Sequence, residues 1–300
     1  MRLGFVGLGE MGSRIATRLI DQGNELVLYD IDTAIAERVA GDRAEIAGSP
    51  REVASRAETV LVSLPTPDVV EEVAMGSDGL VAGDALRVYV DMSTSGPQTA
   101  RVVATKLTEA GIAVLDAPVS GGISGAETGD LSIMVAGDRG VFEANQVLLE
   151  GLGRRIFYVG HVPGQAQTIK VINNLIEAAT LAITSEGMVL GAKAGLNSAV
   201  MLEILNVSSG RNSATAELFP RSIITRKFNE GFAMKLAYKD VKLCNALGRD
   251  LGVPMWVGSC VEQLFACAAS DDDGEHDFTR VAELYERWAG IVLGVDAGAT

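Results

Sequence analysis

Short apolar runs alternate with helical patterns over the first half of the chain. Five runs have the length and the apolar content of strands: RLGFVG (2–7), ELVLYD (25–30), TVLVSL (59–64), RVYVDM (87–92) and AVLDAPV (113–119). Between the first two runs, residues 9–23 place apolar side chains at helical spacing and end in a glycine. Strands that alternate with helices are typical of a parallel sheet covered on both faces, so we expect a doubly wound α/β domain.

From about residue 165 onward the strand-like runs nearly vanish and the pattern becomes helical. Apolar side chains recur at helical spacing in six stretches: 165–194, 197–207, 213–226, 232–250, 254–269 and 277–291. The change of pattern predicts three parts. They are an α/β domain over residues 1–164, a long interdomain helix over 165–194, and an all-helical domain over 195–300.

Charge and composition exclude several classes of function. The chain has 25 basic and 39 acidic residues in 300, a net charge of −14, which argues against nucleic-acid binding through a basic surface. We also expect no membrane partner, because no run of about 18 uninterrupted apolar residues occurs. The N-terminus leads directly into a strand pattern, without a signal-peptide pattern. Three cysteines without CxxC spacing suit a reducing compartment, so we expect a cytoplasmic protein.

Histidine is too scarce to be the main acid–base residue. Only His161 and His276 are present, far apart in the chain, which argues against a metal site and against a histidine–carboxylate pair. An acid–base residue is therefore expected to be of another type, and a candidate is Lys170 in QTIKVINN (167–174), an otherwise apolar stretch of the long helix. Lys170 and Asn174 are four residues apart and share one helical face.

A glycine-rich loop between the first strand and the first helix fits the GxGxxG fingerprint of dinucleotide binding. The first glycine makes the tight turn, the second lets the backbone approach a pyrophosphate, and the third lets the helix pack on the strand. The helix N-terminus then offers N–H groups to phosphate. The loop predicts a Rossmann domain, and its candidate cofactor-binding residues are Gly7, Leu8, Gly9, Glu10, Met11 and Gly12.

Asp30 closes the second predicted strand, 18 residues after Gly12. A carboxylate at this position accepts hydrogen bonds from the adenosine ribose hydroxyls and repels a 2′-phosphate. No arginine follows it in Ile31-Asp32-Thr33. We therefore expect NAD to be preferred over NADP.

Four separated stretches make the chain resemble the β-hydroxyacid dehydrogenases, which include 3-hydroxyisobutyrate dehydrogenase and tartronate semialdehyde reductase. The stretches are GFVGLGEMG at the N-terminus, DAPVSGGISGAETGDLSIMVAGD (116–138), KVINN (170–174) and the pair Lys239-Asp240 after Phe232. The resemblance covers nearly the whole chain. It implies an NAD(P)-dependent oxidoreductase that interconverts a small β-hydroxy acid and its semialdehyde or ketone.

The resemblance also implies roles for particular residues. Lys170 is the general acid/base, and Asn174 binds the substrate or holds the amine. The substrate carboxylate is bound by Ser120, Gly121 and Gly122, which suit an anion because glycine backbone can direct its N–H groups toward it. Further cofactor contacts are implied at loops and on the helical domain: Leu64, Pro65, Thr94, Phe232 and Lys239.

Three alternatives share this pattern. Imine reductases share the fold but usually place another residue at Lys170. A 6-phosphogluconate dehydrogenase shares the lysine and asparagine, but usually has a longer helical domain. A non-catalytic NAD-binding scaffold has no use for the amine. The apolar helical half suggests a homodimer or homotetramer, and the partner expected at the site is a small anionic hydroxy acid.

Overall fold

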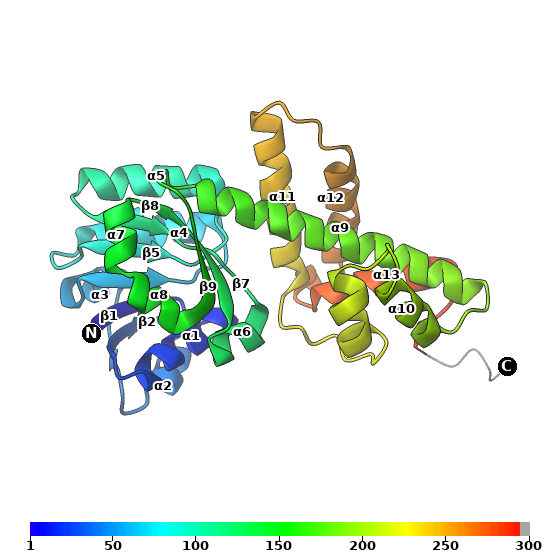
Figure 1. Ribbon diagram of the computed structural model, residues 1–300. Coiled ribbons are helices and arrows are strands. Elements are labelled where there is room, and N and C mark those ends of the chain that lie inside the picture. Colours follow the sequence, from blue (N-terminus) through cyan, green and yellow to red (C-terminus); the bar gives the residue numbers. More distant parts are fainter. Residues whose placement is uncertain (295–300) are drawn as a thin grey trace. The chain divides into compact units, whose positions relative to one another are not determined.

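The computed structural model describes residues 1–294, so the last six residues of the predicted helical domain lie outside the described part. The chain divides into two compact units, Met1–Val171 and Ile172–Thr300. One long helix, α9 (Gln165–Lys193), begins in the first unit and ends in the second (Figure 1).

The first unit is built on a nine-stranded sheet in the order β3-β2-β1-β4-β5-β6-β8-β7, with β9 beside β8. The strands are β1 (Arg2–Val6), β2 (Glu25–Tyr29), β3 (Glu45–Ile46), β4 (Thr59–Val62), β5 (Val88–Asp91), β6 (Ala113–Asp116), β7 (Val119–Ser120), β8 (Leu131–Gly137) and β9 (Gly153–Gly160). The five strands expected from the sequence are confirmed as β1, β2, β4, β5 and β6, and they pair in parallel.

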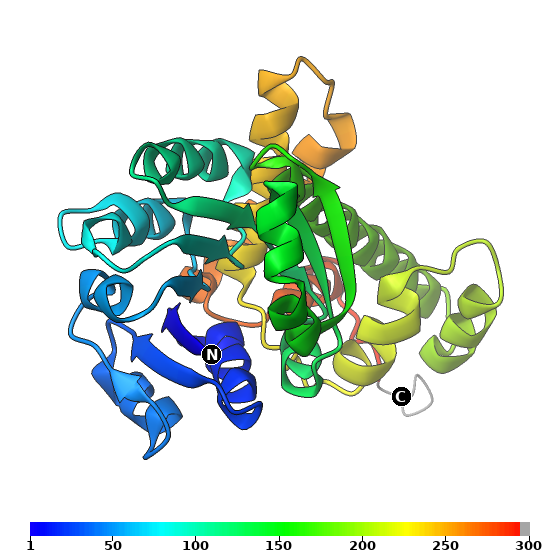
Figure 2. The same ribbon diagram turned by 60° about the vertical axis from the view of Figure 1, so that its left-hand side comes forward.

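The sheet continues beyond the last strand that the sequence predicts. β8 runs antiparallel to β6 and β7, and β9 pairs in parallel with β8 along its length (Figure 2). The expected parallel sheet is therefore a mixed one, in which a parallel part carries an antiparallel extension. Because β6 and β7 both run antiparallel to β8, β7 ends at the same edge of the sheet as β6.

Helices cover both faces of this sheet. They are α1 (Glu10–Asp21), α2 (Thr33–Ala40), α3 (Pro50–Arg56), α4 (Pro67–Met75), α5 (Gly96–Glu109), α6 (Gly122–Thr128), α7 (Arg139–Ala144) and α8 (Gln146–Leu152). Side chains alternate between faces along a strand, so Phe5 and Val6 of β1 enter different cores. Phe5 packs in the core formed with α1, α2 and α6 to α8, whereas Val6 packs in the core formed with α3 to α5.

In its described residues the second unit has helices joined by loops and no strand, apart from one isolated bridge between Ala233 and Asp277. Its helices after α9 are α10 (Ser198–Asn206), α11 (Met234–Asp250), α12 (Trp256–Ala269) and α13 (Val281–Ala289). The helix expected over 213–226 is instead a π-helix over Ala214–Ile223 that contains Pro220. Proline removes a donor from the regular ladder, and a widened turn tolerates the missing bond.

Helix α9 is long and apolar enough to span a membrane by length and composition alone. However, Leu181 and Met188 of this helix are fully buried in the core of the second unit, together with Phe219 and Phe265. One face of the helix therefore packs in the core of the second unit, whereas Ile176, Ile183 and Leu190 are exposed in the single chain.

A buried glutamine binds the first turn of α9 to the sheet. The Gln167 side chain has no exposed surface, and its amide makes four hydrogen bonds. Oε1 accepts the backbone N–H groups of Ser95 at 3.0 Å and Gly96 at 3.1 Å. Nε2 donates to the Ser93 carbonyl and to Asp116 Oδ1, both at 2.9 Å. Every donor and acceptor position of this amide is therefore in use.

Asp116, at the end of β6, completes the attachment. Its Oδ2 accepts the backbone N–H groups of Gly164 at 2.8 Å and Gln167 at 3.2 Å, so the carboxylate caps the beginning of α9. Burial, followed by the Asp91 carboxylate beside it on β5, raises the pKa of Asp116 to about 7, against the lowering effect of these hydrogen bonds. Burial and the same two carboxylates raise the pKa of Tyr89 well above its usual value.

The raised pKa of Asp116 predicts a pH dependence of stability. The folded protein holds this proton more tightly than the unfolded chain does, whose aspartate pKa is near 3.8. The stability that the proton contributes is present at acidic pH and falls as pH rises from about 4 toward about 7. Asp116→Asn removes the titration, so the free energy of unfolding of wild type minus variant should fall by up to about 1.4 kcal/mol per pH unit.

Urea unfolding of both proteins at pH 5, 6, 7 and 8 measures this difference. The variant is expected to be less stable throughout, because an amide cannot accept all three hydrogen bonds. Only the change of the difference with pH tests the assignment, and parallel curves from pH 5 to 7 would show that Asp116 binds no extra proton in the folded state.

Candidate active site

The glycine loop between β1 and α1 has the geometry that a dinucleotide requires. Gly7 has φ of +90°, and a Cβ there would lie 2.3 Å from the Ser63 carbonyl oxygen. A Cβ on Gly12 would lie 1.9 Å from the Gly7 carbonyl oxygen, whereas one on Gly9 would meet no atom within 4 Å. The backbone at Gly9 is thus open to a ligand, and no side chain caps α1 there. These features fit a pyrophosphate group.

Asp30 follows β2 and holds this loop in place. Its Oδ2 accepts the backbone N–H of Leu8 at 2.6 Å, and its Oδ1 accepts the N–H of Asp32 at 2.9 Å. A carboxylate has about four lone-pair positions, so it can still accept a ribose hydroxyl. Ile31, the next residue, is 91% exposed and brings no positive charge. The sequence did not indicate the contact from Asp30 to the glycine loop.

The other predicted loop residues lie at the same edge of the sheet. Leu64 and Pro65 follow β4, and Thr94 follows β5, its parallel neighbour. The Leu64 N–H donates to Ser93 Oγ at 2.9 Å, which ties the two loops together. The carboxyl ends of β1, β2, β4 and β5 are therefore where the structure places the candidate cofactor residues of this unit, as doubly wound folds place their ligands.

Ser120, Gly121 and Gly122 form the turn from β7 into α6. Gly121 has φ of +133° and Gly122 has φ of +61°, both in the region that favours glycine. Both glycines are exposed, and the turn leaves from the edge at which β6 ends. Two consecutive exposed glycine N–H groups can face a carboxylate, which supports the anion site expected from the sequence.

Lys170 lies on the second turn of α9, directly after the anchored first turn. Only 9% of its surface is exposed. A lysine is almost never so buried unless its charge has partners, so this position is not an ordinary solvated surface. The amine lies in the first unit, one helical turn beyond Gln167.

In the second unit, a buried carboxylate joins Asn174 to Lys239. Asn174 Nδ2 donates to Asp240 Oδ2 at 2.6 Å, and Lys239 Nζ lies 3.1 Å from Asp240 Oδ1. Asp240 is only 2% exposed. The sequence singled out Asn174 and Lys239 but gave Asp240 no role of its own. Its position directly after Lys239 in the sequence was the feature from which a role for Asp240 could have been predicted.

Phe232 lies at the border of the core of the second unit. Its ring packs edge-on against Phe278, with 5.5 Å between ring centroids, and its carbonyl accepts the Phe278 N–H. These contacts account for an aromatic residue at this position through packing. They neither require nor exclude the predicted cofactor contact.

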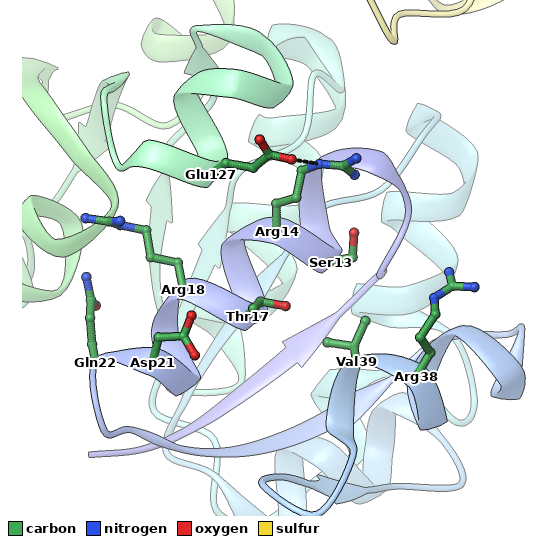
Figure 3. Close-up of a pocket in the computed structure, with 9 residues that line it drawn as sticks. All are labelled: Ser13, Arg14, Thr17, Arg18, Asp21, Gln22, Arg38, Val39 and Glu127. Atoms are coloured by element: carbon green, nitrogen blue, oxygen red, sulfur yellow. Dashed lines mark hydrogen bonds and ion pairs between the residues drawn. The ribbon is translucent and has the colours of Figure 1, made fainter.

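A shallow groove along α1 does not coincide with the predicted site (Figure 3). Its lining residues are Ser13, Arg14, Thr17, Arg18, Asp21, Gln22, Arg38, Val39 and Glu127. Arg14 pairs with Glu127 at 2.9 Å, and Arg18 donates to the Gly151 carbonyl at 2.6 Å. Both arginines are therefore bonded to residues of α6 and α8. We interpret the groove as the place where these helices pack on α1.

Two family models together match most of the chain. Residues 2–160 match the NAD binding domain of 6-phosphogluconate dehydrogenase. Residues 164–285 match the model described as NAD-binding of NADP-dependent 3-hydroxyisobutyrate dehydrogenase. Both units therefore have counterparts in NAD(P)-linked dehydrogenases.

Two relatives named as hydroxy-acid dehydrogenases match over nearly their full length. The chain is 34% identical over 292 residues to 2-(hydroxymethyl)glutarate dehydrogenase of Eubacterium barkeri, covering 97% of each protein. It is 34% identical to 3-hydroxyisobutyrate dehydrogenase of Pseudomonas aeruginosa, covering 94% of this chain and 98% of the relative. The solved structure of Mycobacterium tuberculosis 3-hydroxyisobutyrate dehydrogenase with L-serine superposes with a TM-score of 0.86 at 28% identity, covering 94% and 98% of the two chains. The chain thus belongs to the β-hydroxyacid dehydrogenase family, of which 3-hydroxyisobutyrate dehydrogenase is a member, and is an NAD(P)-linked oxidoreductase of hydroxy acids.

Proposed function

We propose that this enzyme reversibly oxidises a small 3-hydroxyisobutyrate-like β-hydroxy acid to its semialdehyde, with Lys170 as the general acid/base. The observation that carries the proposal is the nearly buried amine on the turn of α9 that follows its anchored start. Such an amine can exchange a proton with an alcohol without competition from bulk water.

The roles of the residues follow from the balance of the reaction. The glycine loop between β1 and α1 would hold NAD, which would supply the hydride acceptor for the carbon of the alcohol. The Lys170 amine takes the hydroxyl proton as the carbonyl forms, and in the reverse direction its ammonium returns that proton to the forming alkoxide. The N–H groups of Gly121 and Gly122, with the Ser120 hydroxyl, hold the substrate carboxylate and so orient the carbon that loses hydride.

Asn174 and Lys239 contribute through Asp240 in this proposal. Asn174 Nδ2 donates to Asp240 Oδ2, and Asn174 Oδ1 accepts a hydrogen bond from Asn173 Nδ2 at 3.2 Å. We infer that Asp240 orients both Asn174 and Lys239 for contact with substrate or cofactor. Phe232 contributes an apolar wall from the border of its core.

We further propose that the enzyme prefers NAD over NADP. The Asp30 carboxylate would lie beside the adenosine ribose, where it accepts a 2′-hydroxyl and repels a 2′-phosphate. The exposed Ile31 supplies no cation to offset that repulsion. The related family model is described as NADP-dependent, so the preference depends on these local residues rather than on the fold.

Among the alternatives, none is favoured by an observation of this chain. The match to a 6-phosphogluconate dehydrogenase model is confined to the first 160 residues, whereas the second unit matches the 3-hydroxyisobutyrate dehydrogenase model. An imine reductase or a non-catalytic scaffold leaves the buried Lys170 without a purpose.

We propose that the protein is a cytoplasmic homodimer or homotetramer. Large apolar side chains of the second unit are exposed in the single chain, including Leu190, Val207, Trp256 and Trp288. A surface of this kind is typical of one that a second copy covers. Sedimentation equilibrium should give a mass of two or four chains, and a mass of one chain at micromolar concentration would contradict the proposal.

Removal of the Lys170 amine tests the chemistry. With the best substrate from a panel of short 3- and 4-hydroxy acids, Lys170→Ala should lower kcat on the order of 10²–10⁴-fold, because proton transfer loses its acceptor. Lys170→Arg should be nearly as slow, because a guanidinium keeps the charge but cannot accept the proton. NADH binding, followed by fluorescence, should survive both changes.

Lys193→Ala is the matched control, since Lys193 lies on the same helix, is exposed, and donates from its amine to the Ala289 carbonyl at 2.7 Å. Its kcat should stay close to that of the wild type. Near-normal turnover of Lys170→Ala would remove the proposed mechanism, whatever the control shows.

Cofactor preference tests the role of Asp30. Wild type should have the higher kcat/KM with NAD, and Asp30→Asn should shift the NAD-to-NADP ratio toward NADP by about tenfold, equivalent to about 1.4 kcal/mol of relieved repulsion. Steady-state kinetics with both cofactors measure the ratio.

Asp32→Asn serves as its control, because Asp32 lies two residues away and caps α2 through Ala34. An equal shift in both variants would mean that general surface charge, rather than Asp30 at the ribose, sets the preference.

A further inference from the structure

We propose that Gln167 is a positioning residue for proton transfer. It fixes the turn of α9 that carries Lys170 relative to the loop between β5 and α5 that carries Thr94. The inference rests on the proposed role of Lys170 and extends it to a side chain that is fully buried within its own network.

The network around Gln167 requires a glutamine. Its Oε1 receives two backbone N–H groups, from Ser95 and Gly96, and its Nε2 supplies two acceptors, the Ser93 carbonyl and Asp116. A planar amide of this length meets two donors and two acceptors at once. A glutamate has the right length but lacks the Nε2 donor, and an alanine leaves four buried polar groups without this partner.

The contacts join three segments that are distant in sequence. Gln167 belongs to α9, Asp116 ends β6, and Ser93 to Gly96 form the loop after β5. Leu64 is attached to the same loop through Ser93 Oγ. One amide therefore connects the helix with the lysine to the loops where the cofactor residues Leu64 and Thr94 lie.

Lys170 is the residue on which this anchor acts. Gln167 and Lys170 are three residues apart, so they are neighbours on one helical face, ~4.5 Å apart along the axis. Without the amide, the start of α9 keeps the two backbone N–H bonds to Asp116 Oδ2 but loses its side-chain attachment to the loop after β5. Proton transfer depends steeply on the position of the amine, since a displacement of about 1 Å can cost about 10²-fold in rate.

The first experiment compares Gln167→Ala with Gln165→Ala. Gln165 lies in the same turn, but its side chain is exposed and accepts the Val162 N–H at 3.1 Å. Gln167→Ala should lower kcat by about 10- to 10²-fold with little change in the NADH dissociation constant. Gln165→Ala should remain within about twofold of wild type, a change within 0.5 kcal/mol for a surface position. Equal kcat in the two variants would overturn the inference.

A double variant separates positioning from general stability. If Gln167 acts through the lysine, Gln167→Ala should cause no further loss of kcat in a Lys170→Ala background. A full additional loss there would overturn the inference. An active Lys170→Ala would instead remove the proposed function, whereas an inactive Lys170→Ala beside a fully active Gln167→Ala would remove only the positioning role.

Gln167→Glu provides a second test of the positioning role if the alanine variant folds poorly. Among the titratable groups, Asp116 of β6 contacts this position directly, and Asp91 and Tyr89 of β5 lie beside Asp116. Lys170 lies one turn further along α9. A protonated glutamate can donate to Asp116 and accept from Ser95 and Gly96, so the anchor is restored at low pH.

The kcat of Gln167→Glu relative to wild type should therefore rise as pH falls from 10 to 6. Two carboxyl groups compete for one proton at this site, which disfavours the ionised pair. A ratio that stays as low as that of Gln167→Ala over the whole range would contradict the positioning role.

Discussion

The candidate site depends on how a helix begins against the edge of a sheet. The first turn of α9 has backbone N–H groups without helical partners, and the Asp116 carboxylate accepts two of them. The Gln167 amide then joins that carboxylate to the loop after β5. A buried polar network of this kind is stabilising when its members are satisfied, as the two donor and two acceptor positions of the Gln167 amide are.

The same network brings two carboxylates close together away from water. Asp91 and Asp116 are paired across β5 and β6, and Tyr89 lies two residues before Asp91. Two buried charges side by side are unfavourable, and the raised pKa of Asp116 reduces this repulsion because it favours the neutral form of that carboxyl group. The rigidity of the α9 anchor and the protonation of the sheet edge are thus two consequences of one arrangement.

The glycine loop shows how one fingerprint serves both fold and function. Gly7 and Gly12 approach each other and Ser63 so closely that a side chain has no room, whereas Gly9 is open. Asp30 holds the loop by accepting the Leu8 N–H. The same carboxylate lies at the end of β2, where it would accept a hydrogen bond from the adenosine ribose of a bound cofactor. Replacing Asp30 therefore changes loop geometry as well as charge, which is why an isosteric asparagine is the informative substitution.

Local pattern in the chain was sufficient for the parallel strands, the glycine loop and the long helix, whereas the role of Lys170 was implied by the family resemblance. Strands and helices have different periods of apolar side chains, and the glycine spacing reflects sterics within a few residues. The antiparallel extension by β8 and the contacts of Gln167, Asp116 and Asp240 were decided only by the tertiary structure. Gln167 meets Ser93 across 74 residues, and Asn174 meets Asp240 across 66. The sequence does not distinguish a solvated glutamine or aspartate from a buried one, because burial depends on contacts with residues that are distant in the chain.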